Sequence, residues 1–192
     1  MWIASEALCG KFVTLEVLES RHIAELENAV RDGELWTLWY ATVPRVQEMA
    51  QYVLRAIEGA QRGDVAFAVR DVASQLVVGT TRYYNVDARN RRALIGYTWF
   101  SASAHRSPIN TESKLLMMEA LFEAYAAIAV EFRTHFFNRA SRAAIERLGA
   151  KQDGILRNHQ IMQDGSYRDT VVYSIVAAEW PAVKMNLQSK LV

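Results

Sequence analysis

The chain has 192 residues, 51% of them hydrophobic, and its 22 basic and 21 acidic residues leave a formal net charge of +1 at pH 7. This length and composition predict one domain, residues 1–192, with a sizeable apolar core. The balanced charge gives no reason to expect nucleic acid or an anionic membrane as the main partner, and the lone Cys9 excludes an internal disulfide and a cysteine-based zinc cluster.

The first part of the chain is predicted to contain a strand followed by two helices. Residues 12–17 have the pattern of an opening strand. Ser20 is placed to cap a helix, and Pro44 suits the first turn of a second helix. Each helix carries apolar residues at helical spacing, which predicts one buried face. These residues are Ile23, Leu26 and Val30 in the first helix and Val46, Met49, Val53 and Ile57 in the second.

Three strands are predicted next, at residues 65–69, 76–86 and 92–100. In the first of them, Val65, Phe67 and Val69 alternate with smaller or polar residues, as in a half-buried strand. The turn at residues 87–90 joins the other two strands. So short a connection favours antiparallel pairing.

The stretch from Arg91 to Gly149 is the most informative part of the chain. After the strand come a loop at residues 101–111, a long helix (NTESKLLMMEALFEAYAA), a strand from near Val130, and a helix from Asn138 to Gly149. A helix start presents unpaired backbone N–H groups and a partial positive charge, which suit a phosphate. Two polar helix starts beside two strands therefore predict a slot for an extended, phosphate-bearing cofactor.

The C-terminal part predicts a hairpin and a short helix. Residues 155–162 and 168–177 flank Asp164-Gly165, a strong hairpin signal, and a helix follows near residues 179–188. The long helix between the strand ending at Phe100 and the strand beginning near Val130 argues for one parallel crossover. The predicted fold is α+β (α/β layered), with a mixed, mostly antiparallel sheet of about seven strands and helices on both faces.

Three blocks of the sequence resemble the GNAT superfamily of N-acetyltransferases, in particular its RimJ/RimL-like branch. The blocks are IGYTWFSASAHRSPINTESKLLMMEALFE, VEFRTHFFNRASRAAIERLGAKQDG and MQDGSYRDTVVYSI. The resemblance covers nearly the whole chain. It implies the GNAT fold with a splayed central strand pair, and acetyl-coenzyme A (acetyl-CoA) bound in the gap between those strands.

The resemblance also implies a phosphate-binding loop after the first splayed strand. The superfamily pattern is Gln or Arg, two residues, Gly, one residue, then Gly or Ala. Here His105, Pro108 and Asn110 stand at those three positions. Proline has no N–H, so one expected amide donor is absent. The alternative is that the segment is only a capped helix start, but the flanking blocks favour phosphate binding. The predicted cofactor-binding residues of this loop are His105, Arg106, Ser107, Ile109, Asn110 and Thr111.

Asn138 and Ser141 match the family's asparagine and serine at the start of the last core helix. In relatives these residues contact the pantetheine arm and the thioester region, so both are predicted cofactor-binding and catalytic residues. Ser141 lies on the inward stripe of its helix, and donation of a proton to the departing thiolate is one role for it. The alternative is that Asn138 only caps the helix and that the Ser141 hydroxyl bonds a nearby carbonyl.

The first splayed strand is expected to stabilise the oxyanion formed when an amine attacks the thioester. A backbone N–H near Trp99, Phe100 or Ser101, freed where the strand splays, is the predicted donor. The general base is less clear, since Leu94 replaces a glutamate that many relatives carry. His135, with a reference pKa near ~6.5, is the predicted catalytic base. The alternatives are a packed histidine, or a water chain that ends at Asp169, Glu131 or a backbone carbonyl.

Aromatic residues are predicted to wall the acceptor site. Trp36, Trp39 and Tyr40 fall in the region that helps to form this wall in relatives, and Tyr97 is a further candidate. Core packing is the alternative, and it is expected for at least one of them. His22 and His159 have no acidic or cysteine partner at metal-binding spacing, so no metal is predicted.

The sequence thus predicts an enzyme that transfers acetyl from acetyl-CoA to a primary amine, either a protein N-terminal α-amine or a small-molecule amine. The alternative is a non-catalytic acyl-CoA-binding module, which Leu94 and Pro108 favour. The N-terminal segment lacks a basic leader and a long apolar run, so a cytoplasmic protein without a membrane segment is expected. Many relatives pair as dimers, which leaves a homodimer open for this chain.

Overall fold

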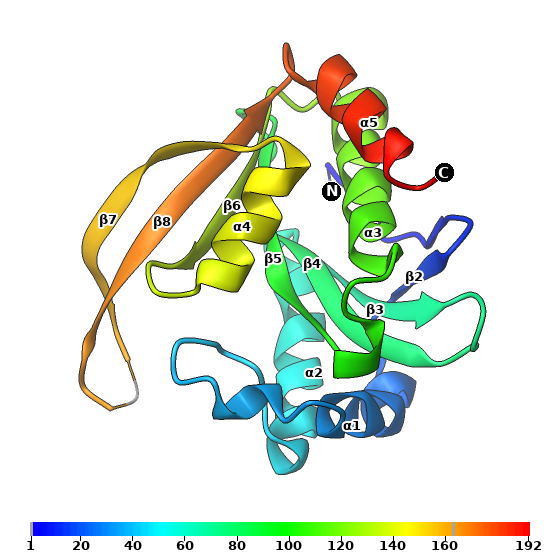
Figure 1. Cartoon of the computed structure of the whole chain (residues 1–192), viewed down its shortest axis with the longest axis vertical. Coiled ribbons are helices and arrows are strands. Elements are labelled where there is room, and N and C mark those ends of the chain that lie inside the picture. The colour runs from blue at the N-terminus through cyan, green and yellow to red at the C-terminus, as the bar shows by residue number, and fades with distance from the viewer. Residues whose placement is uncertain (1, 163) are drawn as a thin grey trace.

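The structure is a computed structural model that describes residues 2–162 and 164–192, and the strands within these residues form one eight-stranded sheet (Figure 1). The strand order is β1-β2-β3-β4-β5-β6-β8-β7. The strand beyond the predicted seven is the two-residue β1, which pairs with β2. The strands are β1 (Leu8–Cys9), β2 (Val13–Val17), β3 (Val65–Asp71), β4 (Val77–Asp87), β5 (Arg92–Phe100), β6 (Ala129–His135), β7 (Lys151–Ile161) and β8 (Tyr167–Val176).

The predicted parallel crossover is present between β5 and β6. The other neighbouring strands of the described chain pair antiparallel. Parallel pairing covers only Arg92 to Leu94 of β5 against Ala129 to Glu131 of β6. Beyond these residues β5 continues to Phe100 and β6 to His135 without pairing to each other, so the central strands splay as the family resemblance implied.

Helices cover both faces of the sheet (Figure 1). Two helices pack with Trp99 and the alanines of β3 into one apolar cluster, and the other helices pack on the opposite face with Val65, Phe67 and Val69. Both faces of β3 are therefore buried, whereas the sequence pattern indicated a half-buried strand. The helices of the first face are α1 (Ile23–Arg31) and α2 (Met49–Glu58), and those of the second are α3 (Ile109–Glu119), α4 (Arg139–Leu148) and α5 (Trp180–Ser189).

The first two helices begin differently from the sequence prediction. A 3₁₀ turn, Ser20–His22, precedes α1, and the main-chain N–H of Glu19 donates to Nδ1 of the buried His22 at 3.0 Å. The predicted Ser20 cap is therefore wrong, because a histidine two residues later supplies the acceptor. The second helix follows a 3₁₀ turn, Val46–Glu48, in which the Glu48 carboxylate accepts from the N–H of Arg45. Pro44 lies outside that turn.

The later elements follow the prediction closely. Asn138 caps α4, and Gly149 ends it in the left-handed conformation, with φ of 104°, that glycine adopts without steric cost. Helix α3 starts slightly earlier than expected, with Pro108 as its cap residue, and a π turn, Ala120–Ala124, closes it. Among the described residues, no helix is both long and apolar enough to cross a bilayer.

Candidate active site

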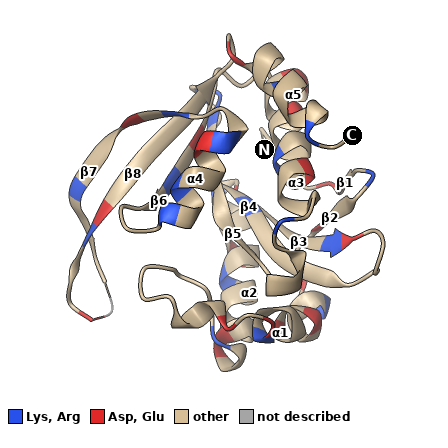
Figure 2. Ribbon diagram, in the orientation of Figure 1, with Lys and Arg blue, Asp and Glu red and all other residues tan. Residues whose placement is uncertain are grey.

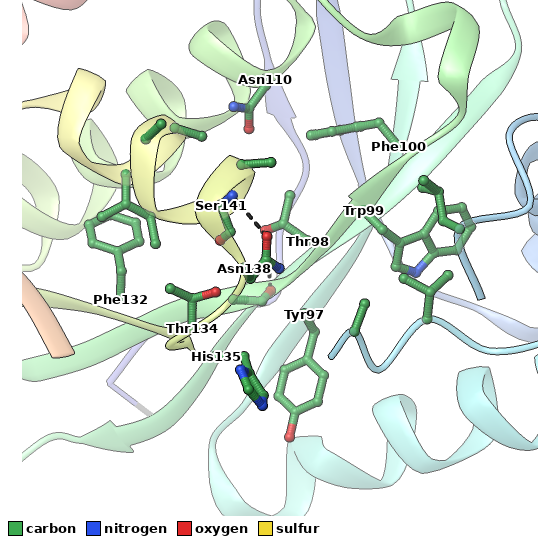
Figure 3. A pocket seen from close by; sticks show the side chains of 18 of the residues that line it. Tyr97, Thr98, Trp99, Phe100, Asn110, Phe132, Thr134, His135, Asn138 and Ser141 are labelled. Atoms are coloured by element: carbon green, nitrogen blue, oxygen red, sulfur yellow. Dashed lines mark hydrogen bonds between the residues drawn. The ribbon is translucent and has the colours of Figure 1, made fainter. Parts of the chain in front are cut away.

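A cleft of about 580 Å³ opens where β5 and β6 part (Figure 3). Its walls come from the splayed halves of these two strands, from the start of α3, from α4 along its length, and from the loop at residues 38–43. The predicted residues that line it are Tyr40, Tyr97, Trp99, Phe100, His105, Arg106, Ser107, Asn110, Thr111, His135, Asn138 and Ser141. Segments far apart in the sequence therefore meet at the gap between β5 and β6.

A bulge in β5 reshapes the wall of this cleft. Tyr97 has φ of 50°, and the pairing of β5 with β4 shifts register there, from Thr80 opposite Trp99 to Arg82 opposite Gly96. A positive φ is strained for a tyrosine. The Tyr84 ring fills the space beside Gly96, where a Cβ would lie 2.7 Å from the ring. The bulge thus turns Tyr97 out of the regular ladder and into the cleft.

The main chain of β5 offers a donor to the gap. In an antiparallel ladder, successive residues direct their N–H and C=O groups alternately to opposite sides. The N–H of Ser101 donates to the carbonyl of Val78 at 2.8 Å, so the N–H of Phe100 points away from β4 and into the gap. The Phe100 carbonyl points the same way, since it lies 3.1 Å from Nε2 of His105. Of the three predicted donors, the amide of Phe100 is free, and those of Trp99 and Ser101 face β4.

The loop before α3 presents a cluster of main-chain N–H groups. Arg106 is held at φ of 59°, which bends the chain at the mouth of the cleft. Within residues 2–162 and 164–192, the N–H groups of four loop and helix residues have no hydrogen-bond acceptor. These residues are Arg106, Ser107, Asn110 and Thr111. The donors converge at a helix N-terminus, so this part of the cleft fits a diphosphate, even with Pro108 at the family's glycine position.

Two residues of the predicted phosphate loop serve its own structure. His105 turns its ring back to the Phe100 carbonyl and donates its main-chain N–H to Ala102. The N–H of Ile109 reaches the Ser107 hydroxyl at 3.3 Å, and that hydroxyl donates to the carbonyl of Ala104 at 2.6 Å. These contacts hold the loop in shape and leave the amides of its neighbours for a ligand.

The start of α4 contributes Asn138 and Ser141. Oδ1 of Asn138 accepts from the main-chain N–H of Ser141 at 3.0 Å, so the capping role is present. Both side chains line the cleft together with Thr98 of β5 (Figure 3). The cap occupies only the carbonyl oxygen of the Asn138 amide and leaves its NH₂ group for another partner. Capping and contact with a ligand are therefore compatible.

His135 is 3% exposed and ends β6 beside the cleft. Its Nδ1 accepts from the N–H of Phe137 at 3.1 Å, so the neutral ring carries its hydrogen on Nε2. Burial lowers the pKa of His135, and nearby Arg168 lowers it further, while Asp169 acts in the opposite direction. In this tautomer Nε2 has no lone pair with which to accept a proton, which argues against His135 as the base.

The predicted acceptor residues separate into two groups. Tyr40 and Tyr97 line the cleft, and Trp39 packs edge-on against the His135 ring at 5.1 Å while remaining 58% exposed. Trp36 instead packs against the α1–α2 cluster and lines a different hollow. The structure therefore places three of the four at the end of the cleft beside His135, the predicted acceptor end, and Trp36 away from it. Periodicity could not make this distinction, because none of the four lies in a long helix or in a regular stretch of strand: Trp36 is in a short 3₁₀ turn, Trp39 and Tyr40 are in a loop, and Tyr97 is at a bulge.

Sequence reasoning missed Lys114 of α3. This residue is 5% exposed, yet it borders the cleft, and its Nζ donates to Oγ1 of Thr98 at 2.6 Å and to Oγ1 of Thr81 at 2.9 Å. Burial lowers the pKa of Lys114 to about 7. A charged residue on the apolar side of a helix was the available signal (NTESKLLMM), but its partners lie on strands distant in sequence.

The charge of the cleft has one sign. Among the described residues that line it, none is Asp or Glu, and five are basic: Arg106, Lys114, Arg133, Arg147 and Arg168. Figure 2 shows basic positions along β6 and α4, which form one wall. Glu131 pairs with Arg92 and Arg133, and Asp169 pairs with Arg157. No group of three or more His, Cys, Asp or Glu side chains in the described chain could hold a metal ion.

Solved structures of acetyltransferases match the fold of this chain. The structure matches a GCN5-related N-acetyltransferase from Brucella melitensis with a TM-score of 0.89 and 28% identity, over 100% of this chain and 88% of that one. It matches a probable GNAT-family acetyltransferase from Chromobacterium violaceum with a TM-score of 0.82 and 26% identity, over 93% and 89%. Mycobacterium smegmatis RimJ, solved in complex with CoA-disulfide, matches in fold with a TM-score of 0.76 at 22% identity, over 93% and 88%.

No curated protein matches the sequence. A protein-family model does match it, and it identifies the same family as the structural comparison. The family model described as "Acetyltransferase (GNAT) domain" matches residues 13–151, which is more than half of the chain and runs from β2 into β7. The splayed strands, the helix-start amides and this match agree, and the chain belongs to the GNAT family of acetyltransferases.

Proposed function

We propose that this protein transfers the acetyl group of acetyl-CoA to a primary amine, either the α-amine of a protein N-terminus or a small molecule. The observation that carries the proposal is the cleft between β5 and β6, in which main-chain N–H groups at the start of α3 have no acceptor among the described residues. Acetyl transfer is the family's chemistry, and the RimJ neighbour was solved with a CoA derivative. Assignment to the RimJ/RimL-like branch, a homodimer and a cytoplasmic location belong to the same proposal.

Each part of the cleft has a role in this reaction. The amides of Arg106, Ser107, Asn110 and Thr111 bind the diphosphate, and the Phe100 N–H binds along the pantetheine arm or at the thioester oxygen. The amine enters past Tyr40 and Tyr97. A bond forms between its nitrogen and the acetyl carbon, and the bond between that carbon and sulfur breaks. The Ser141 hydroxyl donates a proton to the departing thiolate, and water takes the proton that the amine loses.

The lack of a carboxylate in the described lining bears on the type of amine. For a lysine-like amine of pKa ~10.4, deprotonation at pH 7 costs about 4.6 kcal/mol, and for a peptide α-amine of pKa ~8 roughly 1.4 kcal/mol. His135 holds its Nδ1 against a main-chain N–H, so it offers little help to a strongly basic amine. We therefore favour an α-amine, or another amine of low pKa, as the acceptor.

The rival function is a non-catalytic acyl-CoA-binding module. The observation that favours it is Leu94, which is buried where many relatives carry a glutamate. Thiol release from acetyl-CoA, measured with a panel of α-amines and other primary amines, separates the two functions. Turnover above the no-enzyme rate supports the enzyme. Saturable acetyl-CoA binding with no turnover on any amine supports the rival.

The Ser141→Ala variant sharpens this test. Loss of a general acid is expected to lower kcat by about 100-fold, with acetyl-CoA affinity within a few-fold of the parent. Ser189→Ala, which removes a hydroxyl from the last turn of α5, is the matched control and should retain parental kinetics. A parental kcat in Ser141→Ala would remove the proposed proton donation.

A further inference from the structure

The acceptor end of the cleft carries arginine charge that no carboxylate of the described residues neutralises. Arg168 of β8 lines this end, and its Nε donates to Oγ1 of Thr170 at 3.1 Å. No described carboxylate forms an ion pair with it. Because guanidinium stays protonated in proteins, Arg168 gives this end of the cleft a permanent positive charge.

A second arginine packs against Tyr97, one of the residues that line this end of the cleft. Arg82 of β4 is 8% exposed, and its guanidinium carbon lies 4.0 Å from the ring centre of Tyr97 and 5.0 Å from that of Tyr52. Its Nε and Nη2 atoms are buried without a hydrogen-bond partner among the described residues. These two atoms share one edge of the guanidinium, the edge that binds a carboxylate through two parallel N–H groups.

Two acidic side chains near this end of the cleft are already paired with other residues. Glu131 accepts from Arg133 and lies 3.4 Å from Arg92, so two arginines share one carboxylate. Asp169 accepts from Arg157 and from the main-chain N–H of Asn158. The acceptor end thus has a surplus of positive charge in a partly buried region, where an unpaired charge is costly.

We propose that the acceptor is a primary amine that also carries a carboxylate, with Arg168 as the residue that binds this carboxylate and Arg82 as a second positive charge behind Tyr97. This inference rests on the proposed function and narrows its substrate class. The same charges repel polycationic amines, which would need an acidic pocket. The aromatic rings of Trp39, Tyr40 and Phe137 beside His135 suit an acceptor with an apolar side chain, such as an aromatic amino acid.

The test compares each acid with its amide. Acetyl-CoA turnover is measured with phenylalanine and phenylalaninamide, and with other amino acids paired in the same way. Each kcat/KM is first divided by the fraction of the amine that is deprotonated at the assay pH, because the neighbouring carboxylate makes the α-amine of the acid more basic than that of the amide. On this basis the acid should have the higher kcat/KM, by roughly 10- to 100-fold, the range expected for a hydrogen bond to a charged group. Arg168→Gln should remove this preference mainly through a higher KM for the acid, and Arg168→Lys should retain part of it. Arg55→Gln removes an exposed charge from α2 and should retain the full preference.

The outcomes are distinguishable. Equal kcat/KM for acids and amides, or a preference that survives in Arg168→Gln, overturns the inference and leaves the proposed function intact. A higher kcat/KM for phosphoethanolamine than for the amino acids, lost in Arg168→Gln, overturns the carboxylate in favour of a phosphate. Absence of turnover with every amine, in a protein that still binds CoA, overturns both the inference and the proposed function.

Discussion

Lys114 is the residue whose burial has the clearest energetic consequence. Its ammonium group lies between α3 and the sheet with two threonine hydroxyls as partners, and burial lowers its pKa to about 7. A protonated lysine in this position is destabilising relative to the unfolded chain, where the pKa of lysine is about 10.4. The position therefore costs stability, which suggests that the amine is kept for the cleft it borders.

The pH dependence of stability follows from this shift. Below pH 7 the amine of Lys114 is protonated in both the folded and the unfolded chain, and the full cost of burying its charge is present. Between pH 7 and about 10 only the unfolded state binds it, so the free energy of unfolding rises by about 1.4 kcal/mol per pH unit from this residue. Urea denaturation of Lys114→Met between pH 7 and pH 9.5 should show a slope smaller by about that amount, and higher stability than the parent at pH 7.

The Lys114→Met substitution leaves no threonine hydroxyl without a partner, because Oγ1 of Thr81 and Oγ1 of Thr98 also bond each other at 2.8 Å. Lys151→Met is the control, since Lys151 is exposed and lies far from this contact. It should keep the parental slope. If the free energy of unfolding changes with pH by the same slope in Lys114→Met and in the parent, from pH 7 to pH 9.5, then Lys114 keeps its proton in the folded protein.

At the scale of elements, α4 unites a capping function and a chemical one at Asn138. Removal of the cap in Asn138→Ala should destabilise the protein by about 1 kcal/mol, with a loss of kcat as well. Asn138→Ser retains a cap acceptor, so its stability should stay near that of the parent. If the amide NH₂ acts on the ligand, Asn138→Ser should still lose activity; urea denaturation and kcat for the two variants check this. A serine variant with parental kcat would leave Asn138 with a capping role alone.

The elements that sequence predicted best are those with local determinants. Helix α4 was bounded correctly because Asn138 and Gly149 act on adjacent backbone, and the β7–β8 hairpin because Asp164-Gly165 favours a tight turn. The start of α1 was missed because its acceptor is the His22 side chain. The bulge at Tyr97 was missed as well, because it arises from packing against β4 and leaves no periodic signal.

The candidate site divides in the same way. The loop at residues 105–111 and the Asn138 helix start were found from sequence, since a helix start creates its own unpaired amides. Lys114, Arg82 and Arg168 were not proposed, because their significance depends on what the fold leaves unpaired around them. Which carboxylates are already taken by other arginines is a tertiary property, and no local pattern records it.

At the scale of the whole molecule, the cleft exists because β5 and β6 pair over three residues and then part, while α3 and α4 close the two sides. A ligand that spans this gap joins two parts of the sheet that share few hydrogen bonds. Binding should therefore stabilise the fold beyond local contacts. At a ligand concentration of 100 times Kd, the expected gain in the free energy of unfolding is about 2.7 kcal/mol.

Amide hydrogen exchange shows which part of the chain the ligand stabilises. With CoA bound, the amides of Arg106, Ser107, Asn110 and Thr111 should exchange more slowly, because each gains an acceptor that it lacks in the free protein. The start of α1, on the other face of the sheet, serves as an internal control. Thr111→Glu should abolish the protection at the loop, since it places an anion at the helix start where the diphosphate binds, whereas the uncharged Thr111→Gln should retain it. Protection confined to other segments, with this loop unchanged, would mean that the helix-start amides do not hold the coenzyme.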